Sequence, residues 1–151
     1  MPELNNCPDI VKPVRLSCHC GSFRQAERVV TQLYEKFLKP SGVTITQLSI
    51  LKIVTARPGV TTGQLANALV MDSTTLTRTL RIIQNNNWIF AGENEDRRKR
   101  HWTTTESGQQ KLQEAIPLWM SAQNELTRLS RDVDLDALGS TMFNVVLQMS
   151  K

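Results

Sequence analysis

Apolar residues recur every three or four positions through most of the chain, which is the spacing of one buried helix face. The first stripe predicts a helix over about 20–38, and Pro40 and Gly42 follow it as helix-ending residues. Its apolar members are Phe23, Ala26, Val30, Leu33 and Phe37. Residues 1–17 contain three prolines and no sustained period, so we expect an extended N-terminal arm there.

Three shorter stripes follow, each after residues that cap helices well. The expected caps are Thr44 or Thr46 for the first helix, Thr61 or Thr62 for the second, and Asp72 or Ser73 for the third. Arg57-Pro58-Gly59 ends the first of these helices, and Val70-Met71 connects the other two. The third ends at Asn85-Asn86-Asn87, because asparagine tolerates the left-handed conformation that often closes a helix.

Alternation predicts two short strands, at 88–91 and 100–104, on either side of a charged turn. A long helix then begins after Thr105 and runs to about Arg131. We expect Pro117 to bend this helix, because proline removes a backbone donor. The predicted fold class is therefore mainly α, with one small hairpin.

Both C-terminal helices carry apolar seams of the kind that pack against another helix. The seam of the long helix consists of Leu112, Ala115, Trp119, Ala122, Leu126, Leu129 and Val133. The last helix begins at Asp134 or Asp136, and we expect it to bury its seam. That seam consists of Leu135, Leu138, Met142, Val145 and Met149.

The composition excludes several classes of protein. The chain has 151 residues, enough for one core with at most a helical extension. Apolar residues make up 40% and charged residues 21%, which argues against a disordered or collagen-like chain. No run of about 18 apolar residues is present, and the N-terminus has no apolar signal region. We therefore expect a cytoplasmic protein with no membrane partner.

The net charge of +4 is unevenly distributed. Residues 1–71 carry eight bases and four acids, residues 72–104 carry six bases and four acids, and residues 105–151 carry four bases and six acids. Four of the bases are consecutive, at 97–100. This pattern favours a face that binds a polyanion and a different role for the acidic end. A merely solvated turn at 97–100 is the alternative.

The central helices and the hairpin follow the order of a winged helix-turn-helix. In that motif the second helix enters the major groove, roughly 12 Å wide, and its first turns face the base edges. Here those turns read Ser73-Thr74-Thr75-Leu76-Thr77-Arg78. The hydroxyls and Arg78 suit bases or phosphates, and Arg81 suits a phosphate. The alternative is a Ser/Thr-rich helix start that only caps itself.

The tip of the hairpin adds Asp96, Arg97 and Arg98. An arginine inserted into a narrow minor groove gains from the negative potential there. The neighbouring aspartate can orient the arginines by ion pairing. The tip is therefore a second candidate DNA contact.

Catalytic motifs are not found in the sequence. The histidines, His19 and His101, lie outside any metalloprotease or nucleophile-elbow pattern, and the seven glycines form no phosphate loop. We therefore expect neither enzymatic activity nor a cofactor.

Three cysteines, Cys7, Cys18 and Cys20, are too few and too clustered for a disulfide framework. Three interpretations stay open: packing, a redox-active thiol at the start of the first helix, or a soft metal site if Cys7 folds back onto the other two.

The motifs together resemble the MarR family of bacterial winged-helix regulators, from about Cys18 to Lys151. Asp96-Arg97-Arg98, with Gly108 twelve residues after Asp96, resembles the wing motif of that family. Residues 72–78 resemble the start of its recognition helix, and 64–66 the preceding helix. Pro117-Leu118-Trp119 with Ala122-Gln123 resembles a subgroup that often carries Cys-x-Cys before the first helix.

The resemblance implies a homodimeric repressor that binds a pseudo-palindromic operator and is released by a small aromatic ligand or by thiol oxidation. It implies an arm at 1–17, a dimerisation lobe made of 18–43 and 105–151, and a winged helix-turn-helix lobe at 44–104. The alternative is a winged-helix module that binds proteins and no specific DNA.

The resemblance and the residue patterns together nominate three sets of site residues. The DNA-binding set is Thr62, Gln64, Ser73, Thr74, Thr75, Thr77, Arg78, Arg81, Arg97 and Arg98, with Asp96 as wing support. The ligand-pocket set is Phe23, Leu33, Phe37, Leu51 and Trp119. The dimer-interface set is Leu126, Leu129, Val133, Leu138, Met142, Val145 and Met149.

Two positions depart from the family pattern, and so does the placement of the cysteines, which form a Cys-x-Cys before the first helix. Thr104 replaces the usual leucine, so we expect looser packing of the second wing strand, and Asn87 replaces the usual glycine after the recognition helix. The peroxide sensors of the family carry a reactive cysteine inside the first helix with tyrosine partners. Because this chain has only Tyr34, that mechanism is not carried over.

Overall fold

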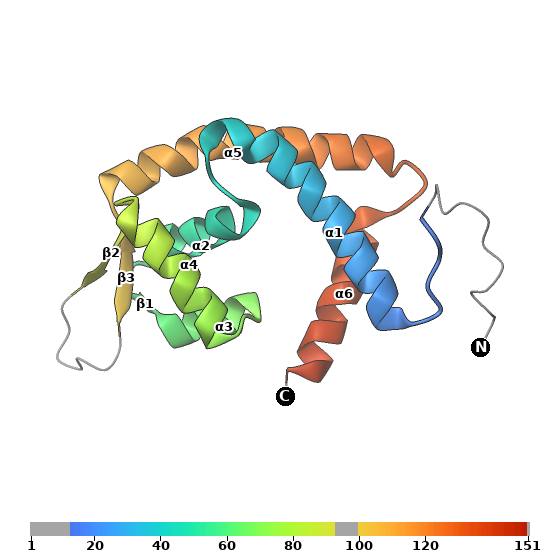
Figure 1. Cartoon of the computed structure of the whole chain (residues 1–151), viewed down its shortest axis with the longest axis horizontal. Coiled ribbons are helices and arrows are strands. Elements are labelled where there is room, and N and C mark those ends of the chain that lie inside the picture. The colour runs from blue at the N-terminus through green and yellow to red at the C-terminus, as the bar shows by residue number, and fades with distance from the viewer. Residues whose placement is uncertain (1–12, 93–99, 151) are drawn as a thin grey trace.

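The computed structural model describes residues 13–92 and 100–150 and confirms a mainly helical fold (Figure 1). Its elements in chain order are α1 (His19–Leu38), the 3-10 helix η2 (Lys39–Ser41), α2 (Ile45–Ala56), β1 (Val60–Thr61), α3 (Thr62–Leu69), α4 (Ser73–Asn85), β2 (Ile89–Gly92), β3 (His101–Thr104), α5 (Glu106–Leu129) and α6 (Leu135–Met149). In Figure 1, α2–α4 and the sheet lie at one end, α1 and α6 lie at the other, and α5 runs above both.

The helix starts agree with the predicted caps. Five cap side chains each accept the backbone N–H three residues on, at 2.8–3.2 Å. They are Thr44, Thr61, Asp72, Thr105 and Asp134. In α2 and α3 a glutamine also reaches back to the backbone of its cap, which completes a capping box. Short-range hydrogen bonds therefore decide where these helices begin.

The sheet has three strands rather than two. Its order is β1-β3-β2, and both pairings are antiparallel. Val60 lies opposite Trp102, and Ile89 lies opposite Thr104. The hairpin was expected from the sequence, whereas β1 has only two residues and no alternation that could have indicated it. Pairing with β3 alone makes it a strand.

The main core joins α2, α3, α4 and the sheet. Its largest fully buried members are Ile50, Leu51, Val54, Leu65, Leu76, Leu80, Ile83 and Ile89. All of them except Ile89, which lies in β2, come from the three short helices that the apolar spacing predicts. The core holds α3 and α4 in fixed relation to the strands of the wing.

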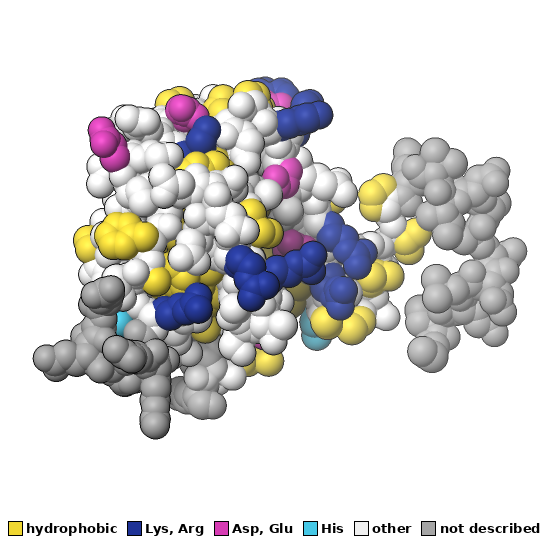
Figure 2. All heavy atoms as spheres, turned by 60° about the vertical axis from the view of Figure 1, so that its left-hand side comes forward, with side chains coloured by type: hydrophobic (Ala, Val, Ile, Leu, Met, Phe, Trp, Pro, Cys, Tyr) yellow, Lys and Arg dark blue, Asp and Glu magenta, His cyan; other side chains and the backbone are white. Residues whose placement is uncertain are grey.

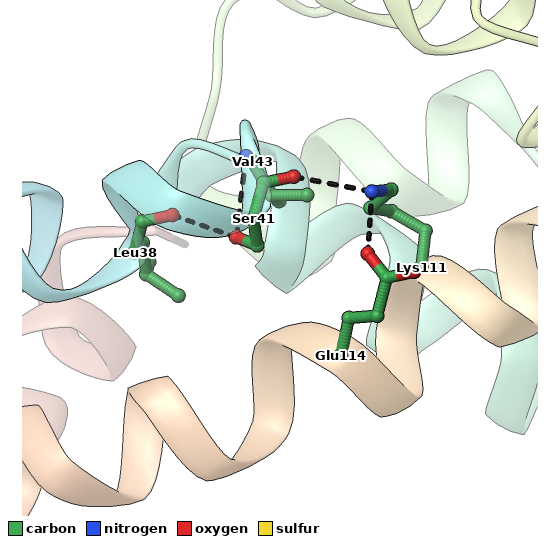
Figure 3. A network of polar contacts seen from close by, with 5 residues as sticks. All are labelled: Leu38, Ser41, Val43, Lys111 and Glu114. Carbon is green, nitrogen blue, oxygen red and sulfur yellow. Dashed lines mark hydrogen bonds and ion pairs between the residues drawn. The ribbon is translucent and has the colours of Figure 1, made fainter.

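A second cluster joins α1 and α2 to α5 through Leu38, Val43, Leu48 and Ala115. A polar network closes one edge of it (Figure 3). Lys111 Nζ lies 2.6 Å from a carboxylate oxygen of Glu114 and donates to the Ser41 carbonyl at 3.2 Å. The Ser41 hydroxyl in turn donates to the Leu38 carbonyl at 2.7 Å. Lys111 thus ties the first half of α5 to the turn after α1.

Helix α5 continues as one helix through Pro117, and the predicted bend at that residue stays a prediction. Helix α6 differs from expectation, because none of its residues is buried within the chain. Leu138 is 41% exposed and Met149 is 80% exposed. The prediction that α6 buries its seam is therefore wrong for a single chain, because the described residues cover that face only in part.

The apolar surface of α6 is also wider than the predicted seam. Phe143 and Leu147 are exposed as well, and they lie on a different side of the helix from Leu138 and Val145. At 100° per residue the apolar arc spans roughly 200°.

In the described part of the chain no helix is long and apolar enough to cross a membrane.

Candidate nucleic-acid interface

Helix α4 has one buried face and one exposed polar face. Leu76, Leu80 and Ile83 point into the core. The exposed face lines a shallow surface hollow with Ser73, Thr74, Thr77, Arg78 and Arg81, which we call the recognition face. The structure therefore brings five of the predicted DNA-binding residues together. Thr75 is exposed but does not line this hollow.

Asp72 caps α4 and carries a negative charge at its start. Its carboxylate accepts the backbone N–H of Thr75 at 2.8 Å. Hydrogen bonding from Thr75, through its side chain first and its backbone second, holds the pKa of Asp72 below its usual range. Since Asp72 performs the capping, the alternative in which the Ser/Thr residues only cap the helix is not needed.

The hydroxyls of the recognition face are not equivalent. Thr77 donates to the Ser73 carbonyl at 2.6 Å, so its oxygen faces outward only as an acceptor. For Ser73 and Thr74, no side-chain hydrogen bond is recorded within the described residues. These two hydroxyls can both donate and accept, which suits phosphates and base edges alike.

Positive charge on this side of the molecule comes from exposed arginines. Neither Arg78 nor Arg81 forms an ion pair with any residue in the ranges 13–92 and 100–150. Figure 2 turns the end that carries α2–α4 and the sheet toward the viewer. Several Lys and Arg side chains, in dark blue, lie together below the middle of this face. Guanidinium groups that form no ion pair within those ranges, beside hydroxyls, make a surface that favours phosphate oxygens.

A second hollow, of about 430 Å³, lies between the start of α3, α4 and β3. We call it the α3–β3 hollow. Its polar lining consists of Thr61, Thr62, Thr77, Arg81, Gln84, Arg100 and Trp102. The indole Nε1 of Trp102 donates to the Thr62 hydroxyl oxygen at 2.9 Å. From the sequence, Arg100 was noted only as part of the basic run 97–100, and Trp102 was not nominated for DNA binding. Only the β1–β3 pairing brings β3 beside α3.

Gln64 lies apart from the other nominated residues. Its side-chain oxygen accepts the Thr61 backbone N–H at 2.9 Å, as part of the capping box. It lines a separate hollow together with Arg57 and Asn67, away from Thr62. Residues two positions apart on a helix point about 200° apart. The structure therefore does not join Gln64 to the recognition face.

The three wing-tip residues nominated from the sequence, Asp96, Arg97 and Arg98, lie outside the described residues. Their roles stay predictions.

The nominated ligand-pocket residues are spread over the described part of the single chain and are not gathered at one place. Leu51 is fully buried in the main core, and Phe23 is 49% exposed. Phe23 and Phe37 are separated by roughly 21 Å along α1, at 1.5 Å per residue. Trp119 instead packs under Lys52, whose Nζ lies 3.9 Å from the ring centroid. Leu51 belongs to the core rather than to a pocket.

Two of the three cysteines are described, and both are exposed. Cys18 is the N-cap of α1, and Cys20 lies in its first turn. The preceding segment folds onto this helix, because Gln25 Nε2 donates to the Val14 carbonyl at 3.0 Å. Cys7 lies outside the described residues, and among those described no group of three His, Cys, Asp or Glu side chains could hold a metal ion.

Two departures from the family pattern have clear structural outcomes. Thr104 is buried, and its hydroxyl shares a hydrogen bond of 2.8 Å with the Thr55 hydroxyl. The looser packing expected there is not seen, because this bond satisfies both polar groups. Asn87 takes the left-handed conformation, with φ of 59°, as expected. Its carbonyl accepts the Thr105 hydroxyl and thereby links the end of α4 to the start of α5.

Comparison with known proteins agrees with this geometry. The profile of the MarR family matches residues 43–99. The transcriptional regulator MosR of M. tuberculosis, solved in complex with DNA, is 32% identical, with 85% of this chain and 98% of that chain covered and a TM-score of 0.69. The uncharacterized HTH-type transcriptional regulator YwoH of Bacillus subtilis (strain 168) is 26% identical over 82% of this chain and 90% of its own length.

The same fold recurs at lower identity. The transcriptional repressor CouR bound to a 23-mer DNA duplex has a TM-score of 0.77 at 21% identity, with 89% of this chain and 99% of that chain covered. CouR has also been solved bound to p-coumaroyl-CoA, at 21% identity and with 85% of this chain and 91% of that chain covered; its TM-score is 0.76.

Proposed function

The chain belongs to the MarR family of transcriptional regulators, and from this membership we propose that it is a homodimeric repressor that binds a specific, pseudo-palindromic DNA operator. The recognition face enters the major groove in this proposal. Release from DNA follows binding of a small molecule or oxidation of a thiol.

The observation that carries the proposal is the recognition face itself. The exposed side of α4 carries hydroxyls and two arginines that form no ion pair with any described residue, while its buried side packs into the core with α3 and the sheet. A rigid helix with that polar face fits the major groove, where side chains near its start reach base edges. MosR, at 32% identity, has been solved bound to DNA.

The dimer is supported by the apolar surface that one chain leaves uncovered. Leu129, Val133, Leu138, Val145 and Met149 of the predicted interface are all substantially exposed. Leu126 and Met142 are half-buried. A second copy that packs against α6 and the end of α5 would remove this surface from water. Such a dimer presents two recognition faces to two half-sites.

Two routes of release are supported by different observations. Cys18 and Cys20 are exposed at the start of α1, where an oxidant can reach them. The alternative route is a small aromatic ligand, and CouR, which shares the fold, has been solved with p-coumaroyl-CoA.

The DNA-binding proposal is tested by selecting fragments of the source genome that the protein retains, followed by titration of the enriched duplex. We expect Arg78→Ala to weaken binding by about 10-fold or more, because one base or phosphate contact contributes roughly 1–3 kcal/mol. Arg24→Ala, an exposed arginine on α1, is the matched control and should change affinity little. If no fragment is enriched over competitor DNA, the protein-interaction alternative replaces the proposal.

The release route is decided on the same duplex. If oxidation releases the protein, hydrogen peroxide should dissociate the wild type and leave the Cys18→Ser/Cys20→Ser variant bound. Release of that variant by peroxide would remove these thiols from the mechanism, and insensitivity of both proteins would favour the ligand route.

A further inference from the structure

We propose that the α3–β3 hollow binds a phosphate of the DNA backbone, and that Trp102 is a positioning residue that aims the Thr62 hydroxyl at that phosphate. This inference rests on the proposed DNA binding and adds a site to it. The site lies between the recognition helix and the wing, and two of its residues, Arg100 and Trp102, were not among those nominated from the sequence.

The charges in the hollow suit a phosphate. Arg81 enters from α4 and Arg100 from the residue before β3. None of the described residues that line the hollow is acidic. Thr77 and Arg81 are four positions apart, so both face the hollow from one side of α4. Two guanidinium groups that converge from different elements can bracket a phosphate oxygen pair.

The donor in the hollow is set by a buried indole. Trp102 is 2% exposed, and its Nε1–H can only donate a hydrogen bond. In the 2.9 Å bond to Thr62, the hydroxyl oxygen must therefore be the acceptor. Within residues 13–92 and 100–150 the proton of the Thr62 hydroxyl has no hydrogen-bond acceptor. It is therefore free to donate to an anion in the hollow.

The sheet brings these groups together. Val60 pairs with Trp102 in the β1–β3 ladder, and the chain passes from β1 directly into α3 at Thr62. Side chains two positions apart on a strand share a face, which puts Arg100 on the same side as Trp102. A wing strand that shifts on DNA would therefore also move the Thr62 hydroxyl.

The test measures affinity for two duplexes, the selected one and an unrelated one, across a range of KCl concentrations. Thr62→Val removes the hydroxyl and keeps the shape of the side chain. We expect it to lower the affinity for both duplexes by about 5- to 10-fold. Arg100→Ala should lower the affinity for both duplexes. It should also reduce the magnitude of the slope of log affinity against log salt concentration by about one. Thr31→Val and Arg24→Ala on α1 are the matched controls.

The positioning role of Trp102 predicts that the losses of affinity in Trp102→Phe and Thr62→Val are not additive. Trp102→Phe keeps a buried ring but removes the donor, so it should reproduce the loss seen for Thr62→Val. The double variant should bind no more weakly than Thr62→Val alone, because Trp102 acts only through Thr62. Additive losses, or wild-type affinity in both single variants, would overturn the inference.

A spectroscopic measurement covers the case in which Trp102→Phe does not fold. The Nε1–H resonance of Trp102, identified by its displacement in Thr62→Val, should move when duplex is added and stay in place in potassium phosphate at the same ionic strength. A saturable shift with potassium phosphate but none with duplex would assign the hollow to a free anion and overturn the proposal.

The outcomes separate the two proposals. If Arg78→Ala loses affinity while Thr62→Val and Arg100→Ala do not, DNA binding stands and the phosphate site is wrong. If the wild type binds neither duplex, both proposals fail.

Discussion

Two residues other than glycine take the left-handed backbone conformation in the described chain. Asn87 has φ of 59° and Val70 has φ of 52°. Asparagine tolerates this region, whereas a β-branched side chain does so only at a cost in free energy. Val70 closes α3 and is 62% exposed, so little packing compensates for the strain. The turn of the helix-turn-helix is therefore a point of stored strain.

Replacing Val70 with glycine should stabilise the protein. We expect Val70→Gly to raise the free energy of unfolding by about 1 kcal/mol, because glycine adopts positive φ without a Cβ clash. Urea denaturation measures the change. Val29→Gly is the control, since Val29 is exposed inside α1, where glycine should destabilise by up to about 1 kcal/mol. A loss of stability in Val70→Gly would contradict the strain.

Asp72 makes the start of the recognition helix sensitive to acid. Its pKa is lowered in the folded protein by hydrogen bonding from Thr75, so the unfolded chain binds the proton more tightly. The stabilisation is therefore fully present above the ordinary aspartate pKa, near 4, and is lost as pH falls through the lower folded value.

This linkage predicts a pH-dependent effect of removing the carboxylate. Asp72→Ala should lower Tm most at neutral pH, and the difference from wild type should shrink as pH falls below about 4. Thermal melts between pH 3 and 7 measure it. Asp132→Ala, in the turn between α5 and α6, is the control. A difference in Tm that is equally large at pH 3 would argue against the charged cap.

At the scale of elements, the wing and α5 meet at a contact that only glycine permits. A Cβ on Gly108 would lie 2.0 Å from the Trp88 carbonyl oxygen and 2.8 Å from a methyl carbon of Thr104. The backbone of α5 therefore lies directly against the residue before β2. This close approach fixes the angle at which the long helix leaves the winged lobe.

A methyl group at this position should disturb that junction. Gly108→Ala is expected to lower the free energy of unfolding by about 2–3 kcal/mol, because a backbone carbonyl cannot move aside as a side chain can. Gly63→Ala is the matched control: its Cβ would meet open space in α3, where alanine favours the helix. Chemical denaturation of both variants measures the difference, and equal stabilities would refute the contact.

At the scale of the whole molecule, α6 contributes no buried residue to the core of a single chain. Its apolar arc extends past the predicted seam to Phe143 and Leu147, yet none of its residues is buried. A helix that exposes more than half of its circumference as apolar surface requires cover in water. The second copy of the proposed dimer supplies that cover.

The dimer is tested by adding a charge to the arc. Leu138→Glu should weaken the dimer by about 100-fold or more, because an unpaired carboxylate is costly to bury. Light scattering should then give a mass near 17.1 kDa where the wild type gives twice that value. Asn144→Glu adds the same charge on the polar side of α6 and should leave the mass unchanged. A monomeric wild type would exclude the dimer.

The sequence by itself determined the features that depend on near neighbours. Helix caps three residues from their partners, the apolar stripes of the core and the left-handed Asn87 were all readable, because their hydrogen bonds and periodicity are local. The family motifs could also be identified without the structure, because they consist of residue types at fixed separations along the sequence.

Only the tertiary structure decided the features that join distant segments. It made a strand of β1, placed Trp102 against Thr62, removed Gln64 from the recognition face and buried Leu51 in the core. It also left α6 uncovered. Each of these outcomes depends on which elements pack together, and packing joins side chains whose distance along the chain says nothing about their distance in space.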